Sequence, residues 1–168
     1  VDRVTNVRYT LIGSGGARGM EGDGLPWRLD APQSGGGLIM DVGCHVLDRI
    51  DYLMGPLENT RGKALRKEGT PGLVENYVVV KAVIGECDWA AIPSAGATVS
   101  CTWDFRGDEE RDELEILGPK GSLRMAGMSP SLPISVCDVS GRVVRELTFD
   151  QPEHNGQAMI QTDTDELA

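Results

Sequence analysis

The hydrophobic residues of this chain follow two different periods. In eight segments apolar and polar residues alternate, which is the pattern of half-buried β-strands. These predicted strands are Val4–Gly13, Leu57–Arg66, Glu75–Ile84, Thr98–Arg106, Asp112–Leu117, Ser122–Met125, Ile134–Asp138 and Arg142–Phe149. Turn sequences such as T-P-G, R-G-D-E-E and G-P-K-G separate the later strands. Short strands joined by tight turns predict a largely antiparallel sheet.

The most apolar stretch has a helical period instead. We expect a helix from about Gly36 to Met54, ended by Gly55-Pro56. Its apolar positions recur at roughly 100° per residue and form one arc. This arc holds Leu38, Ile39, Val42, Val46, Ile50 and Leu53, with Gly43 among them, while Asp41, Asp48 and Tyr52 lie opposite and His45 lies at the border. A last helix is expected over His154–Leu167 and a glycine-rich loop over Ser14–Gly24.

The order strand, helix, many strands, helix differs from an alternating βαβ pattern. It predicts an α+β fold, with one twisted, predominantly antiparallel sheet and helices packed on one face. At 168 residues the chain is long enough for a single domain, residues 1–168. Segments such as Tyr77–Ile84 carry apolar residues on both faces, so we expect a second copy to cover the open sheet face in a homo-oligomer.

The net charge and the cysteine spacing limit the kinds of partner and site that we expect for this chain. A net charge of −10 argues against nucleic-acid binding, because phosphate contacts need clusters of Lys and Arg. No run of about eighteen apolar residues is present, so we expect no membrane span. The cysteines are far apart and form no C-x-x-C pair, which favours reduced thiols in a cytoplasmic protein over a zinc site or disulfides. They are Cys44, Cys87, Cys101 and Cys137.

The start of the predicted helix carries the most suggestive chemistry. Asp41 and His45 are four residues apart, behind the triple glycine Gly35–Gly37. On a helix they share a face, where a carboxylate can orient an imidazole as a general acid or base. The glycines would let backbone or ligand approach closely. Asp41 and His45 could instead be an ordinary side-chain pair on a helix. They could also be two ligands of a metal, although the sequence shows no third ligand.

Trp27 and Arg28 precede this segment and are candidates for a pocket lining, with Arg28 as a contact for an anion or hydroxyl. Trp27 could equally anchor the preceding loop to the core. The glycine-rich loop is not a phosphate-binding motif, since no Lys-Ser/Thr pair follows it. The nucleophile elbow G-x-S-x-G is absent as well.

Taken together, these motifs carry a family resemblance. W-R followed by G-G-G-L-I-M-D-V-G-C-H-V-L-D-R-I-D-Y-L-M-G resembles the C-terminal domain of the Gfo/Idh/MocA family of NAD(P)-dependent oxidoreductases. D-E-L-E-I-L-G-P-K-G-S-L is similar to a strand–turn–strand unit of that family, and P-E-H with the following M-I-Q-T and D-E-L is similar to its last helix. The resemblance runs in order through nearly the whole chain.

The resemblance implies an N-terminal Rossmann domain that binds NAD or NADP, followed by this domain, with a fold like that of glyceraldehyde-3-phosphate dehydrogenase. It also implies subunit contacts through the open sheet face. Asp41 and His45 match the positions that, with a lysine of the Rossmann domain, contact the substrate hydroxyl and move its proton. The implied reaction is oxidation of a carbinol in a sugar, polyol or related compound, with Trp27 and Arg28 lining the pocket.

The sequence departs from the family in one respect, because it has neither a G-x-G-x-x-G fingerprint nor the E-K-P that bears the lysine. It also starts without Met and stops within the predicted last helix, so we expect a fragment of a longer two-domain protein that is inactive alone. Two alternatives remain within the family. One is a non-catalytic sensor or regulatory protein, and the other is an NAD-dependent glycosidase.

Overall fold

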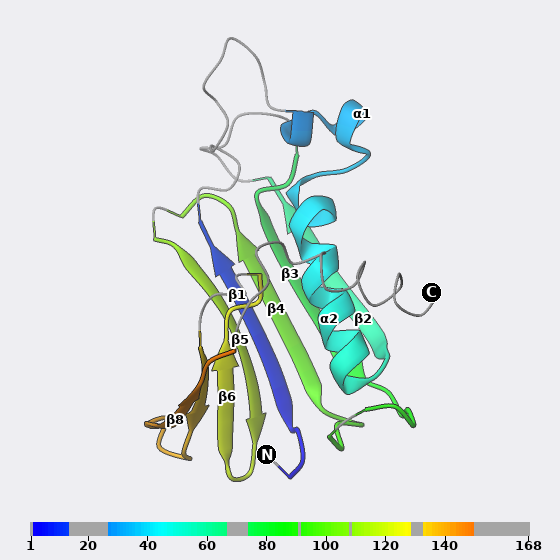
Figure 1. Ribbon diagram of the computed structural model, residues 1–168. Helices are drawn as coiled ribbons and strands as arrows, with labels where there is room; N and C mark the ends of the chain where they lie inside the picture. Colours follow the sequence, from blue (N-terminus) through cyan, green and yellow to red (C-terminus); the bar gives the residue numbers. More distant parts are fainter. Residues whose placement is uncertain are drawn as a thin grey trace, which may run out of the picture.

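The computed structural model describes residues 2–13, 27–66, 74–90, 92–107, 109–128 and 133–149. They form one mixed layer of strands with a long helix against it (Figure 1). The strands are β1 Asn6–Ile12, β2 Leu57–Leu65, β3 Tyr77–Ile84, β4 Thr98–Asp104, β5 Arg111–Gly118, β6 Gly121–Met125, β7 Ile134–Cys137 and β8 Val143–Leu147. The helical elements are η1 Trp27–Leu29, α1 Ala31–Ser34, the π-helical turn η2 Ile39–Gly43, and α2 Cys44–Met54. Each strand expected from the sequence is confirmed.

The eight strands make one sheet in the order β2-β3-β4-β1-β5-β6-β7-β8. Neighbouring strands are antiparallel except β1 and β4, which run parallel, with Val7 beside Val99. The predominantly antiparallel α+β fold predicted from the sequence is therefore confirmed. The last predicted helix, His154–Leu167, and the whole loop Ser14–Gly24 lie outside the described residues.

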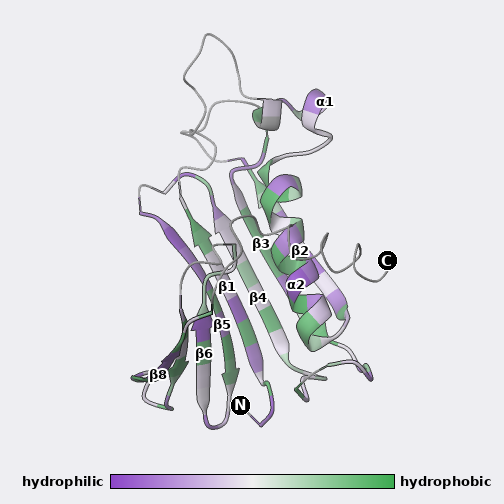
Figure 2. Ribbon diagram, viewed as in Figure 1, coloured by the Kyte–Doolittle hydropathy of each residue, from purple (hydrophilic) through white to green (hydrophobic). Residues whose placement is uncertain are grey.

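The core lies between α2 and the sheet. The predicted apolar arc faces inward: Val46 and Ile50 are almost completely buried, and Ile39, Val42 and Leu53 pack against the core. On the opposite side Asp48 and Tyr52 are exposed, while Asp41 is half-buried. Figure 2 shows the same separation of hydrophobic and hydrophilic positions along the helix. Gly43 is buried and faces β4, where a Cβ would lie 3.6 Å from Cε2 of Trp103, an ordinary contact distance.

A polar cluster fixes the middle of α2 to the other half of the sheet. The Asp112 carboxylate accepts hydrogen bonds from the Tyr9 hydroxyl at 3.1 Å and from the amides of Gly127 and Met128, both at 2.8 Å. The Arg49 guanidinium donates to the Gly127 carbonyl. Burial, together with the neighbouring Asp112 charge, raises the pKa of Tyr9 above its ordinary range. The tyrosine therefore stays neutral and donates a hydrogen bond to Asp112.

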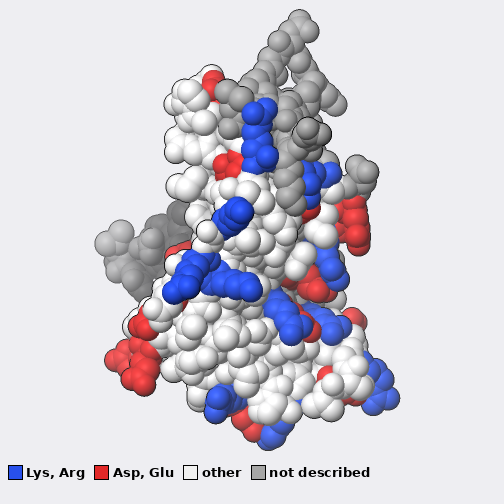
Figure 3. All heavy atoms as spheres, turned by 180° about the vertical axis from the view of Figure 1, so that it is seen from behind, with Lys and Arg blue, Asp and Glu red and all other residues white. Residues whose placement is uncertain are grey.

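The face of the sheet away from α2 is more polar than expected. In β3 the side chains of Tyr77, Val79 and Val83 are half-buried, as predicted, but the neighbouring positions of β4 are mostly threonine and serine. Figure 3 shows Lys and Arg side chains gathered across this face. The second face of the sheet is therefore apolar in β3 but not in the strands beside it. The sequence pattern of one strand does not reveal which residues of its neighbours lie beside it, because that depends on register.

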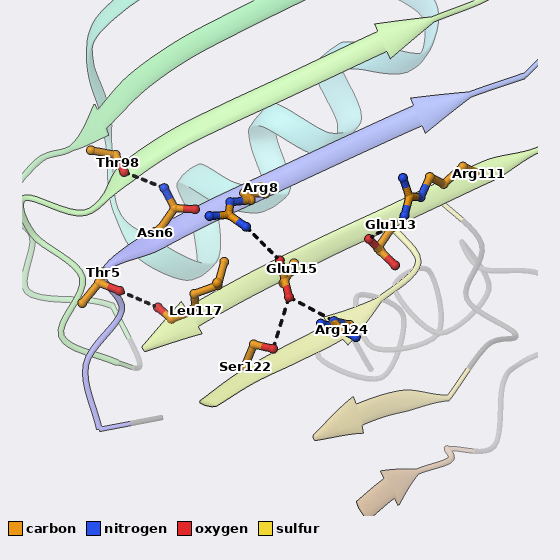
Figure 4. Close-up of polar contacts among 10 residues, drawn as sticks. All are labelled: Thr5, Asn6, Arg8, Thr98, Arg111, Glu113, Glu115, Leu117, Ser122 and Arg124. Atoms are coloured by element: carbon orange, nitrogen blue, oxygen red, sulfur yellow. Dashed lines mark hydrogen bonds and ion pairs between the residues drawn. The ribbon is translucent and has the colours of Figure 1, made fainter. Parts of the chain in front are cut away.

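Several polar groups of this open face are paired with one another. Glu115 has only 13% of its side chain exposed and accepts a hydrogen bond from Arg124 Nε at 3.0 Å. It also forms an ion pair with Arg8 at 3.6 Å (Figure 4). Glu115 therefore compensates part of the positive charge of Arg8 and Arg124 within the chain.

Within the described residues no helix is long and apolar enough to cross a membrane. All four cysteines are free, as the sequence predicted, with Cys44 exposed and Cys101 buried.

Candidate functional site at the start of the long helix

The triple glycine brings the chain tightly into the helix. Gly35 ends α1 in the left-handed conformation, with φ 73°, and donates its N–H to the Ala31 carbonyl. A Cβ on Gly36 would lie 2.5 Å from Cγ of Met40. A Cβ on Gly37 would lie 1.8 Å from Oε2 of Glu75. The close approach expected of these glycines is present, and at Gly37 the approaching group is a carboxylate from the start of β3.

Glu75 supplies the cap that the helix start lacks. The Ile39 N–H donates to Glu75 Oε1 at 3.0 Å, and no side chain at Leu38 caps the turn. A carboxylate at this end of a helix satisfies a backbone donor and interacts favourably with the helix dipole. The sequence analysis missed this residue. A lone glutamate before a strand carries no signal, because its partner lies 36 positions earlier in the chain.

The first turn itself is wider than an α-helical turn. Ile39–Gly43 is π-helical, so its hydrogen bonds span one residue more than those of α2. A Cβ on Gly43 would lie 2.1 Å from Cδ1 of Ile39, so the glycine leaves room for that side chain. The π turn is the second feature that the sequence analysis missed. A hydrophobic period averaged over a whole helix does not reveal one extra residue.

A small pocket lies beside this turn. It has a volume of about 130 Å³ and is lined by Trp27, Ser34, Gly37, Met40 and Asp41. Trp27 is 50% exposed, and Asp41 is half-buried. The structure therefore brings together two of the four residues singled out from the sequence, an aromatic face and a carboxylate.

His45 lies on the first turn of α2, next to this pocket along the chain but not in its lining. Its side chain is exposed, and its imidazole makes no hydrogen bond or ion pair within the described part of the chain. Both ring nitrogens are thus available to exchange a proton with a ligand. Arg28 belongs to η1, and its side chain lies outside the described residues.

The described residues of the site offer no grouped metal ligands, and two amides of the helix start are engaged within the chain. No group of three or more His, Cys, Asp or Glu side chains suited to a metal occurs among the described residues. A pyrophosphate would need free amides at the helix start. There the Ile39 N–H donates to Glu75, and the Met40 N–H donates to the Gly37 carbonyl at 3.1 Å. Two amides of this helix start are therefore already engaged within the chain.

Comparison with known proteins gives a consistent result. Residues 3–124 match the GFO/IDH/MocA C-terminal domain. Oxidoreductase P35 from Formosa agariphila is 27% identical over 135 residues, which cover 80% of this chain and 37% of that protein. The chain thus spans well under half the length of this curated relative.

Solved structures share the fold at lower identity. An aldose-aldose oxidoreductase from Caulobacter crescentus, complexed with glycerol, superposes with a TM-score of 0.70 at 19% identity, over 98% of this chain and 45% of that one. A levoglucosan dehydrogenase in complex with NADH and levoglucosan gives a TM-score of 0.62 at 19% identity, over 88% of this chain and 39% of that one. Since the matched segment takes in most of the sheet, the helix start and its pocket, the chain belongs to the GFO/IDH/MocA C-terminal domain family.

Proposed function

We propose that this chain is the substrate-binding half of an NAD(P)-dependent oxidoreductase that acts on a CH–OH group of a sugar, polyol or related compound. One observation carries the proposal. In a chain of this family, an exposed imidazole and a half-buried carboxylate stand at the same helix start, beside a pocket walled by an aromatic ring. The solved relatives bound to levoglucosan and to glycerol support a hydroxyl-bearing ligand.

Each residue of the site has a role in this proposal. His45 takes the proton from the substrate hydroxyl as the carbinol is oxidised, and returns it in the reverse reaction. Asp41 accepts a hydrogen bond from a substrate hydroxyl and sets the orientation of the ligand beside His45. The Trp27 ring packs against the apolar face of the ligand. Arg28 contacts a further hydroxyl or an anionic group.

The cofactor is bound outside this chain. The sequence contains no G-x-G-x-x-G fingerprint, and the Ile39 and Met40 amides at the helix start already donate within the chain. The hydride acceptor is therefore held by a separate Rossmann domain of a longer protein, and the chain by itself turns nothing over. NADH in the solved complexes of levoglucosan dehydrogenase supports a nicotinamide cofactor.

The test is an assay of the full-length protein that contains this chain, with NAD and with NADP, against a panel of sugars and polyols. Appearance of NADH or NADPH in proportion to a ketone or lactone product supports a dehydrogenase. Cofactor binding without turnover on any substrate would point to a sensor or regulatory protein. Hydrolysis of a glycoside without accumulated NADH would point to a glycosidase.

We also propose that the open sheet face joins copies of this protein. The half-buried Tyr77, Val79 and Val83 supply apolar area for the contact between copies. Glu115 already pairs with Arg8 and Arg124, so these three groups keep charged partners when the face is covered. Sizing of the full-length protein by light scattering is expected to give a dimer or larger assembly. A monomer at micromolar concentration would contradict the proposal.

A further inference from the structure

We infer that Glu75 is a positioning residue: from the start of β3 it holds the π-helical turn in place, and through that turn it sets where Asp41 and His45 stand. The inference rests on the proposed function for its catalytic consequence. The role of Glu75 in holding the turn rests only on the contacts at the helix start.

Glu75 is itself held firmly by the sheet. The next residue, Asn76, is completely buried; its N–H donates to the Leu65 carbonyl at 3.0 Å, and its carbonyl accepts from the Phe105 N–H at 2.9 Å. The backbone at this point is therefore tied to the chain at the end of β2 and to the chain just after β4. A carboxylate on such a backbone is a fixed support rather than a mobile surface group.

The π turn receives support from two sides. Toward the core, Gly43 admits the Ile39 side chain and comes close to Trp103. From the adjoining segment, Glu75 accepts the Ile39 N–H and contacts the bare Cα of Gly37. Asp41 is the middle residue of the turn. His45 is the second residue of α2, which follows the turn. A shift of Ile39 must therefore move Asp41, and with it the start of the helix.

The molecule contains a matched pair at the other end of α2. A Cβ on Gly85 would lie 2.4 Å from Oε1 of Glu58, so a glutamate again covers a bare glycine Cα. The Gly85 N–H donates to the Pro56 carbonyl at 2.8 Å, close to the end of the helix. Glu58 is exposed and caps no helix amide. Variants of Glu58 and Gly85 therefore serve as controls. They remove a glutamate side chain, or add a methyl group to a glycine, away from the helix start.

The experiment compares Glu75→Gln, Glu75→Ala and Gly37→Ala with Glu58→Ala and Gly85→Ala in the full-length protein. Glu75→Ala leaves the Ile39 amide without an acceptor, and Gly37→Ala displaces the carboxylate. Both are expected to lower kcat roughly tenfold with a smaller change in KM, since misplaced groups slow the reaction more than they weaken binding. Glu75→Gln keeps an acceptor oxygen and should restore most of kcat. The two control variants should keep kcat within about twofold.

A second readout does not depend on turnover. Amide hydrogen exchange over the peptide spanning residues 37–44 should become faster in Glu75→Ala and Gly37→Ala, and remain unchanged in Glu58→Ala and Gly85→Ala. If the wild-type protein shows no dehydrogenase activity, the proposed function fails while exchange still decides the role of Glu75. If the wild type is active but Glu75→Ala changes neither kcat nor exchange, the positioning role is wrong. An equal loss of kcat in the Glu58 or Gly85 variants would also overturn it.

Discussion

The two ends of the long helix are built differently. At its start the chain passes through three glycines into a π turn, caps the turn with a carboxylate from another element, and leaves His45 exposed. At its end, Gly55 donates to the Asp51 carbonyl at 2.8 Å, the Asp51 carboxylate accepts the Leu57 N–H at 3.1 Å, and Met54 is buried. Each end uses one distant side chain, Glu75 at the start and Ser94 at the end, but only the start contains a π turn and presents the candidate site.

We infer that the end of α2 serves mainly stability and that its start serves mainly the proposed chemistry. Irregular turns cost free energy and persist where the surrounding structure supports them, often at functional sites. The α-helical end of α2 contains no π turn that needs such support. We therefore expect changes at the end of α2 to alter stability and leave turnover intact, while changes at the start alter turnover first.

The largest expected effect on stability comes from Gly55→Ala. Gly55 has φ 114°, which side chains rarely adopt, and a Cβ there would lie 2.7 Å from Sγ of Cys87. The substitution should lower the free energy of unfolding by about 2 kcal/mol, measured by urea denaturation of the full-length protein. Turnover per folded molecule should stay unchanged. A loss of kcat without loss of stability would break the comparison between the two ends.

A smaller effect at the same end is expected for Ser94→Ala. Ser94 is 4% exposed, and its hydroxyl donates to the Met54 carbonyl, one of the last carbonyls of the helix. Loss of this buried hydrogen bond should cost about 1 kcal/mol of unfolding free energy. Thermal denaturation would measure it, with the exposed Ser140 as the matched position for Ser→Ala. Equal effects at both serines would show that burial at the helix end adds nothing.

The sequence was most informative where a pattern repeats. Alternation located the strands because each has one face turned to the core, as in β4, where Val99, Cys101 and Trp103 are buried and the residues between them are not. The helical period located the buried arc of α2 for the same reason. The family motif around Asp41 and His45 was equally visible, because those residues are close together in the chain.

Features made by single distant contacts were not predictable in this way. The carboxylate of Glu75 reaches Ile39 only because the sheet brings the start of β3 beside the helix start. The π turn lies where Gly43 leaves room for the Ile39 side chain, which no local period encodes. Likewise, the polarity of the open face depends on register, which places Arg8 opposite Glu115.

The most direct test of the account is kcat of His45→Gln in the full-length protein at saturating substrate, beside Asp48→Asn on the same helix. His45 is exposed and lacks partners in the described chain, so its replacement should leave the unfolding transition in place. Removal of a general acid/base should lower kcat by roughly 10²-fold or more. Asp48→Asn should leave kcat near the wild-type value. A His45→Gln enzyme within about twofold of wild type would contradict the central claim.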